Sequence, residues 1–130
     1  MSITFGKKEG ERRDGMERET HIKEKIRIAR RQFEECSALF VALGDVTRQK
    51  IVCDIAEAGE EGINVAQLSG KSLLSRPAIS YHLKVLKNCG ILEPVKQGTQ
   101  IFYRIRLREH FVIVKRLMQT LDEIFAEEDA

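Results

Sequence analysis

The stretch Ser75–Gly90, SRPAISYHLKVLKNCG, constrains the fold of this chain more than any other part of the sequence. Ile79, Leu83 and Leu86 recur at i, i+4 and i+7, which places them on one apolar face of a helix. The first residue of the stretch is a suitable N-cap, because a serine hydroxyl can accept from a first-turn amide. The last is a suitable stop, because glycine tolerates the left-handed conformation. The sequence therefore predicts a helix that buries these three side chains.

The opposite face of the predicted helix is polar and nearly free of acids. Pro77, Ser80, Tyr81 and Lys84 follow the same spacing there. A proline in the first turn costs little, since the amide that it lacks has no acceptor within the helix. A helix that enters the major groove of DNA needs small polar, aromatic and cationic side chains on its outer face. We therefore interpret the stretch as a recognition helix.

Charge is distributed unevenly along the chain. Residues 71–108 hold eight Lys and Arg against one acid, Glu93, a local net charge of +7, although the whole chain carries only +2. The last nine residues hold five acids and no base. This polarity indicates that the basic middle of the chain is the phosphate-facing part.

A β-hairpin is predicted directly after the recognition helix. Residues 91–95 and 101–106 read as two strands, and Ile101, Tyr103 and Ile105 alternate with their neighbours in the second. The loop between the strands, Lys96–Gln100, contains a glycine for a tight turn and no acid. A cationic hairpin beside a recognition helix is a wing, which normally contacts DNA backbone or the minor groove. An ordinary surface hairpin is the alternative.

Helices with long apolar seams are predicted at both ends of the domain, over residues 20–43 and 108–126. Their apolar residues alternate at spacings of four and three, as in a helix that meets another helix. A short domain rarely needs so long a seam for its own core, and homodimers are the commonest oligomers, so we predict a two-fold dimer. The predicted interface consists of Ile22, Ile26, Phe33, Cys36, Phe40, Val114, Leu117, Leu121 and Ile124.

The remaining segments complete the predicted domain organisation. Residues 1–19 are polar and contain three glycines, which predicts a mobile tail before a winged-helix DNA-binding and dimerisation domain at 20–130. Asp45 caps a helix that runs to about Ala58, and the short helix Val65–Ser69 precedes the recognition helix. Two helices joined by a short turn form a helix-turn-helix. The predicted fold is mainly α with a small β-hairpin, a winged helix-turn-helix that dimerises through its N- and C-terminal helices.

Four short motifs occur along residues 38–107. They are LGDVTR at 43–48, SYHLKVL at 80–86, GIL at 90–92 and IFYRI at 101–105. These motifs resemble the ArsR/SmtB family of winged-helix repressors. The resemblance implies a dimer built from the first and last helices, which represses a promoter until an effector binds. It also places base and phosphate contacts on Arg76, Pro77, Ser80 and Tyr81, with wing contacts near residues 97–100.

Taken together, the residues and the resemblance predict a homodimeric repressor that binds a two-fold operator in double-stranded DNA. Ser80 and Tyr81 would read base edges with help from Arg76, and the other cations would neutralise phosphates. The predicted DNA-contacting set is Arg76, Pro77, Ser80, Tyr81, Lys84, Lys96, Gln97, Thr99, Gln100, Arg104 and Arg106. Neither the residues nor the resemblance identifies the effector.

Metal and enzyme chemistry have little support in the sequence. The family's metal-binding members carry a Cys-x-Cys pair before the recognition helix or paired ligands along the last helix. Here the segment 65–69 has no cysteine, and His110 is the single histidine of the last helix. A metal site needs three or four converging ligands, so we predict no metal and no cofactor. No nucleophile–base set or phosphate loop indicates an enzyme.

Three cysteines, an odd number at wide spacing, do not form a disulfide framework, which predicts a reduced cytoplasmic protein. No apolar run is long enough to span a bilayer, so no membrane partner is predicted. Cys53 and Cys89 are expected to be small buried hydrophobes. Two alternatives remain: a winged-helix module that binds protein rather than DNA, and a thiol-responsive repressor that uses Cys36.

Overall fold

The computed structural model describes residues 9–129, with side chains from residue 15 onward. Within it the chain divides into two compact units. The first unit combines the N-terminal segment up to Cys36 with the C-terminal segment from Phe111, and the second unit is Ser37–His110. Each unit has its own core, and we describe them in turn.

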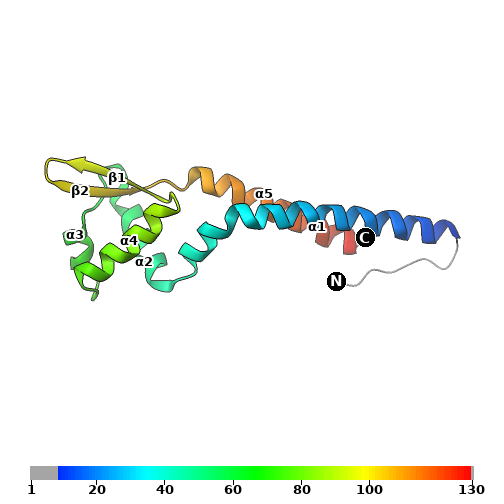
Figure 1. Cartoon of the computed structure of the whole chain (residues 1–130), viewed down its shortest axis with the longest axis horizontal. Helices are drawn as coiled ribbons and strands as arrows, with labels where there is room; N and C mark the ends of the chain where they lie inside the picture. The colour runs from blue at the N-terminus through cyan, green and yellow to red at the C-terminus, as the bar shows by residue number, and fades with distance from the viewer. Residues whose placement is uncertain (1–8, 130) are drawn as a thin grey trace. The chain divides into compact units, whose positions relative to one another are not determined.

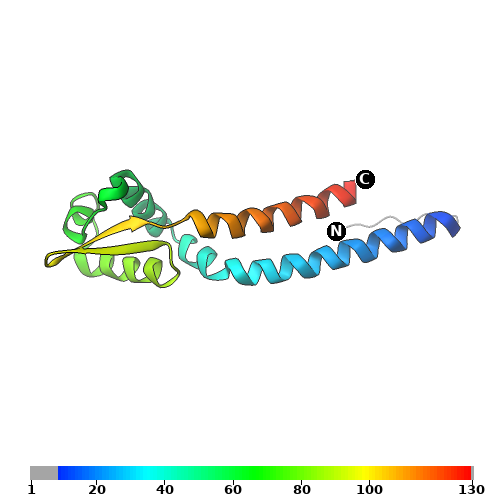
Figure 2. The ribbon, with the colours of Figure 1, turned by 90° about the horizontal axis from the view of Figure 1, so that it is seen from above.

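The first unit is an antiparallel helix pair, in which the part of α1 (Glu9–Leu43) up to Cys36 lies beside the part of α5 (Arg108–Asp129) from Phe111 (Figures 1 and 2). Its core consists of the buried residues Ile22, Ala29, Cys36, Leu117 and Ile124. These residues come from the seams that the sequence predicted, so the apolar spacing correctly identified two helices that each pack on another helix.

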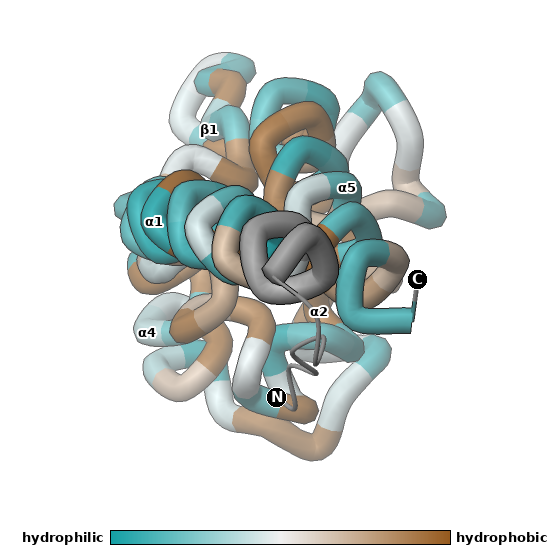
Figure 3. Tube along the Cα trace, turned by 90° about the vertical axis from the view of Figure 1, so that its right-hand side faces the viewer, coloured by the Kyte–Doolittle hydropathy of each residue, from teal (hydrophilic) through white to brown (hydrophobic). Residues whose placement is uncertain are grey.

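Ion pairs flank this core. Lys25 Nζ lies 2.9 Å from Glu123 Oε2, and His21 Nε2 lies 3.3 Å from Glu127 Oε1. The lysine holds the pKa of the Glu123 carboxyl below its usual range, first through the hydrogen bond and then through its charge. The acids at the end of α5, coloured as hydrophilic in Figure 3, therefore serve in part to bind α1.

Both helices of this unit are longer than the sequence predicted. α1 begins at Glu9 rather than near Thr20, and α5 continues to Asp129 rather than Ala126. Residues 9–19 were predicted as tail because of Gly10 and Gly15, but the Glu and Arg that surround the glycines are good helix formers. The rest of the predicted tail, residues 1–8, lies outside the described residues.

The second unit has the element order of a winged helix-turn-helix, and its predicted helices and strands are confirmed to within a few residues (Figure 1). Its elements are α2 (Val46–Ala58), the 3₁₀ helix η1 (Gly59–Glu61), α3 (Val65–Gly70), α4 (Arg76–Asn88), β1 (Leu92–Gln97) and β2 (Gln100–Ile105). The core residues come from every part of this order: Ile51, Ile55, Ile63, Leu68, Ile79, Leu83, Leu86, Ile91 and Leu92.

Side-chain caps define where the helices of this unit begin. Asp45 Oδ1 accepts from the Arg48 amide at 3.0 Å, at the start of α2. Asn64 and Gln67 form a reciprocal capping box at the start of α3, where each side chain accepts from the other residue's amide. A cap satisfies amides that have no partner within the helix, which is why the predicted starts are accurate.

The strands β1 and β2 pair antiparallel, and Gln97 faces Gln100, so Gly98 and Thr99 alone form the turn. Gly98 has φ 65°, a conformation that favours glycine. The sequence predicted a five-residue loop here, but Lys96 belongs to the ladder and faces Ile101. A two-residue turn matches the twist of the strands, so pairing continues further than the loop residues suggested.

A third backbone segment joins the hairpin. The Ile63 amide donates to the Tyr103 carbonyl at 3.0 Å, and the Tyr103 amide donates back to Ile63 at 2.8 Å. Gly62, at φ 74°, precedes this bridge, and a Cβ at that position would lie 2.8 Å from the Tyr103 oxygen. The bridge therefore holds the wing against the segment that leads into α3.

Candidate nucleic-acid interface

Helix α4 begins and ends as the sequence predicts. Ser75 Oγ accepts from the Ala78 amide at 3.3 Å, and the proline lies in the first turn. At the other end, Gly90 donates to the Lys87 carbonyl at 2.9 Å and Ile91 donates to the Leu86 carbonyl at 3.2 Å. These two bonds, with Gly90 at φ 83°, form a Schellman motif that ends the helix and turns the chain into β1.

The two predicted faces of α4 are confirmed. Ile79, Leu83 and Leu86 are at most 2% exposed, so this stripe is fully buried. Every predicted contact residue on the other face is exposed: Arg76, Pro77, Ser80, Tyr81 and Lys84. Tyr81 is 61% exposed although it is a large aromatic residue, which leaves its ring accessible to a partner. The helix thus presents an acid-free polar face supported by a packed apolar one.

The side chains at the tip of the wing are exposed, and one of them is also hydrogen-bonded to another element. Lys96, Gln97 and Thr99 have exposed side chains. Gln100 is exposed too, but its Oε1 accepts from Asn64 Nδ2 at 3.2 Å. Part of the hydrogen-bonding capacity of Gln100 is therefore used to attach the wing to the start of α3.

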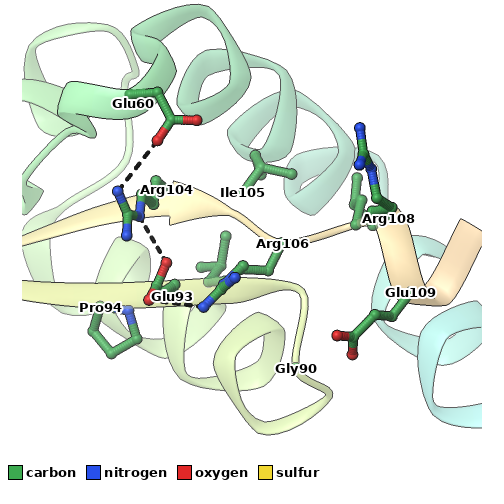
Figure 4. A pocket seen from close by; sticks show the side chains of 11 residues that line it. Glu60, Gly90, Glu93, Pro94, Arg104, Ile105, Arg106, Arg108 and Glu109 are labelled. Atoms are coloured by element: carbon green, nitrogen blue, oxygen red, sulfur yellow. Dashed lines mark hydrogen bonds and ion pairs between the residues drawn. The ribbon is translucent and has the colours of Figure 1, made fainter.

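Arg104 and Arg106 lie in an ion-pair network at the base of the wing (Figure 4). Glu93 Oε2 accepts from Arg104 Nε at 2.7 Å, and its Oε1 accepts from Arg106 Nη2 at 3.0 Å. Arg104 Nη1 also lies 3.3 Å from Glu60. The hydrogen bond from Arg104 is the main cause that holds the pKa of Glu93 below its usual range.

This network changes the predicted charge of the surface. Three of the eight cations in residues 71–108 pair with carboxylates: Arg104 and Arg106 with Glu93, and Lys71 with Glu57 at 3.9 Å. Arg104 also pairs with Glu60, which, like Glu57, lies outside that window. Arg76, Lys84 and Lys96 differ from them, because none of the three lies within 4 Å of a described carboxylate. These three cations without a described carboxylate partner therefore lie on α4 and at the wing tip, while the predicted DNA contacts of Arg104 and Arg106 stay a prediction, with Arg106 63% exposed.

Arg48 is a functional candidate that the sequence did not indicate. Its side chain is only 12% exposed, and its guanidinium contacts the last carbonyls of α1 and the ring of His82 on α4. His82 is half-buried, with its Nδ1 3.4 Å from Arg48 Nη1. The position of Arg48 was a weak indication of such a role. A cation in the first turn of a helix is unfavourable next to the positive end of the helix dipole, so its presence there suggests that it makes a compensating contact.

The predicted dimer residues divide into two groups. Ile22, Cys36, Leu117 and Ile124 are buried inside the single chain, and Ile26, Val114 and Leu121 are half-buried, packed against that core. Phe33 and Phe40 are 45% and 38% exposed. The seam therefore serves first as the chain's own core, because α1 and α5 pack on each other within one chain.

A different apolar stripe is exposed on α5. Phe111, Met118 and Phe125 are 62%, 50% and 55% exposed and recur at intervals of seven residues, so they share one helix face. A helix face of this kind normally packs against another apolar surface. It was missed because the seam at 114–124 is the stronger apolar pattern.

The cysteines differ in environment. Cys36 is 1% exposed, and burial, followed by the charge of Glu35, raises the pKa of its thiol. Cys89 is half-buried and donates from Sγ to the Leu86 carbonyl at 3.2 Å. Cys53 is exposed, so its predicted burial is wrong: α2 turns Ile51 and Ile55 inward and Cys53 outward.

Two properties of the described residues bear on the partners. No three His, Cys, Asp or Glu side chains among them lie close enough together to hold a metal ion. No described helix is both long and apolar enough to cross a bilayer.

Comparison with known proteins identifies relatives of the chain. The family model for the bacterial regulatory protein, arsR family, matches residues 45–93. An uncharacterized HTH-type transcriptional regulator of Methanocaldococcus jannaschii is 35% identical over 89 residues, which cover 66% of this chain and 98% of the relative. The biofilm growth-associated repressor of Agrobacterium fabrum is 31% identical over 91 residues, covering 70% of this chain and 72% of the repressor.

A solved structure agrees with these relatives. The ArsR-like transcriptional regulator from Rhodococcus sp. RHA1 matches with a TM-score of 0.58 at 34% identity, covering 75% of this chain and 83% of that one. The matched residues 45–93 include α4, and the relatives are transcriptional regulators, a class without enzymatic activity. This chain belongs to the ArsR family of winged helix-turn-helix transcriptional regulators, which bind DNA.

Proposed function

We propose that this regulator is a homodimeric repressor that binds a two-fold operator in double-stranded DNA and acts in the cytoplasm, where its target lies. The observation that carries the proposal is the outer face of α4, which is exposed, polar and free of acids over a buried apolar stripe. Major-groove reading needs such a face, and a two-fold operator requires two such helices related by symmetry.

Within this proposal the contacts divide between base reading and phosphate neutralisation. Ser80 and Tyr81 read base edges, and Arg76 assists them. Lys84 and Lys96 neutralise phosphates, while Gln97 and Thr99 at the wing tip contact the backbone or the minor groove. Arg104 and Arg106 bind Glu93 at the base of the wing, and they also remain in the proposed phosphate-contacting set.

The dimer contact in this proposal differs from the predicted seam. Most seam residues are already buried within one chain, so they are not available to a second copy. The exposed stripe Phe111, Met118 and Phe125 fits that role, because a homodimer contact places the same patch of each chain on the partner. Burying three large apolar side chains from each copy would stabilise the dimer by several kcal/mol at roughly 1.5–3 kcal/mol per side chain, before the cost of association.

The test is fluorescence anisotropy of the full chain with a duplex from its own promoter and with a scrambled duplex, across a salt series. We expect tight binding to the promoter duplex, weaker binding to the scrambled one, and affinities that fall steeply with salt because phosphate contacts release counterions. Weak binding to both duplexes at every salt concentration would contradict the proposal. That result would favour the alternative of a winged helix that binds another protein.

A further inference from the structure

Arg48 connects three elements of the second unit. It lies in the first turn of α2, and its Nε donates to the Ala42 carbonyl at 2.6 Å while Nη2 donates to the Val41 carbonyl at 3.2 Å. Its Nη1 lies 3.4 Å from His82 Nδ1 on α4. One nearly buried guanidinium thus caps the end of α1 and contacts the recognition helix.

A hydrogen bond between Arg48 and His82 requires one particular tautomer of the imidazole. A guanidinium has five donors and no acceptor, and it stays charged at all relevant pH values. The contact at Nδ1 is therefore a hydrogen bond only if that nitrogen is the unprotonated acceptor of a neutral imidazole, with the proton on Nε2. A cationic His82 would instead direct an N–H at Arg48.

His82 also contacts the proposed base reader. Its ring and the ring of Tyr81 lie edge to face, with centroids 5.4 Å apart and planes at 65°. Edge-to-face contact fixes the relative orientation of two aromatic rings and contributes beyond the area buried. The orientation of the exposed Tyr81 ring therefore depends on a neighbour that Arg48 holds.

We propose that Arg48 is a positioning residue for DNA recognition, which holds His82 as the Nε2–H tautomer and through it orients Tyr81 at the DNA-facing surface of α4. This inference rests on the proposed function, because Tyr81 is taken as a base reader. Arg48 itself contacts no DNA. Its loss should reduce discrimination between sequences more than it reduces affinity for DNA in general.

The neighbouring residue Gln49 provides a matched control. Gln49 Nε2 donates to the Leu43 carbonyl at 2.7 Å, so it also binds a carbonyl at the end of α1 from the first turns of α2. This hydrogen bond joins Gln49 to α1, whereas Arg48 contacts both α1 and α4. The variant Gln49→Met thus removes a cap on α1 without removing a contact to the recognition helix.

The first measurement uses the full chain without DNA. Nitrogen-15 NMR of the imidazole of His82 distinguishes the two neutral tautomers. We expect the Nε2–H tautomer in the unaltered protein and in Gln49→Met, and a mixture of tautomers in Arg48→Met. A predominant Nδ1–H tautomer in the unaltered protein would overturn the inference whatever the DNA experiments show.

The second measurement uses a duplex that the unaltered protein selects from a random-sequence library, together with a scrambled duplex. If no sequence is enriched, the proposed function fails, and the NMR result still decides whether Arg48 holds His82. If one is enriched, we expect Arg48→Met and His82→Phe each to lower the affinity ratio between the two duplexes roughly tenfold, and the double variant to lower it no further.

The variants His82→Phe, Arg48→Lys and Gln49→Met separate a loss of sequence recognition from a loss of charge or of folding. His82→Phe retains a ring beside Tyr81 but offers Arg48 no acceptor. Arg48→Lys retains the charge but not the fork of donors, so it should restore affinity for both duplexes without restoring their ratio. If Arg48→Met loses its helical circular dichroism, Arg48→Lys and His82→Phe decide the question. Unchanged ratios in both, or a loss in Gln49→Met as large as theirs, would overturn the inference.

Discussion

Arg104 and Glu93 face each other across the two strands of the wing and are joined by a hydrogen bond of 2.7 Å from Arg104 Nε to Glu93 Oε2. The other carboxylate oxygen, Glu93 Oε1, accepts from Arg106 Nη2 at 3.0 Å. A charged, two-sided contact of this kind restrains both strands more than a single exposed ion pair does. The wing is therefore fixed at its base, close to where β2 leads into α5.

This pair gives a pH-dependent stability. Because Arg104 lowers the pKa of Glu93 in the folded state, the contribution is complete above the usual glutamate pKa and is lost as pH falls through the lower folded value. In urea unfolding at a series of pH values, we expect Glu93→Gln to be less stable than the unaltered protein near neutrality. The difference in the free energy of unfolding between the two proteins should decrease as the pH becomes acidic. The exposed Glu61→Gln is the control, and a Glu93 difference that stays constant with pH would refute the argument.

Tyr81→Ala and Lys96→Ala should differ in how they weaken binding to an operator and to random DNA. Loss of Tyr81 should weaken operator binding most and so relax sequence preference. Loss of Lys96 should weaken both duplexes alike and reduce the slope of log affinity against log salt by roughly one unit. Anisotropy titrations across a salt series measure both quantities. If each variant affected the two duplexes equally, this division between reading and neutralisation would be wrong.

Gly62→Ala should destabilise the protein by about 1–3 kcal/mol, through a positive φ and a Cβ that would press on the Tyr103 carbonyl. Alanine substitutions at two other glycines separate the effect of a positive φ from the effect of the contact with Tyr103. Gly59 has φ 64° with open space around it, and Gly70 has open space and no positive φ. We expect alanine to cost most at 62, less at 59 and nothing at 70 in thermal unfolding. Equal costs at 59 and 62 would show that the contact with Tyr103 is unimportant.

Met118→Glu should convert a dimer into a folded monomer. It places a charge in the middle of the exposed stripe of α5, where a second copy would have to bury it. Sedimentation equilibrium measures the mass, and circular dichroism verifies the helices. Met118→Leu keeps an apolar side chain at the same position and should leave the dimer intact. A monomer in the unaltered protein, or a dimer in Met118→Glu, would contradict the proposed contact.

The thiols should react in the order of their exposure. Cys53 should react rapidly with a thiol reagent in the native state, while Cys36 should react only on unfolding, because burial both shields its thiol and raises its pKa. Mass spectrometry of the labelled peptides identifies each site. We expect DNA binding of Cys36→Ser to respond to peroxide as the unaltered protein does. A response that disappears in this variant would support the redox-sensing alternative.

Much of the fold follows from local sequence patterns. The apolar spacing of Ile79, Leu83 and Leu86 and the signals at Ser75 and Gly90 specified α4 to within a few residues, because caps and helical periodicity depend only on near neighbours. The polar outer face of α4 followed from the same spacing. Helix formation by residues 9–19 was not predicted, because Gly10 and Gly15 disfavour a helix locally although the residues around them favour it.

Contacts between residues that are distant in the sequence could not be predicted from such local patterns. Glu60 lies far from Arg104 in the chain, yet it takes part in neutralising that cation, so counting charge in a window overstated the phosphate-facing surface. The apolar seams gave no indication of whether each helix packs on its own chain or on a second copy.

The sequence by itself determined the helices, the hairpin and the exposed reading face of α4, since these depend on periodicity, caps and turn residues within a few positions. Tertiary structure alone decided which cations remain available, that the seam of α1 is buried against α5, and that Arg48 contacts His82. The reason is physical: a charge or an apolar side chain takes its role from whatever folding brings within a few ångströms of it, and that neighbour is often far away in the chain.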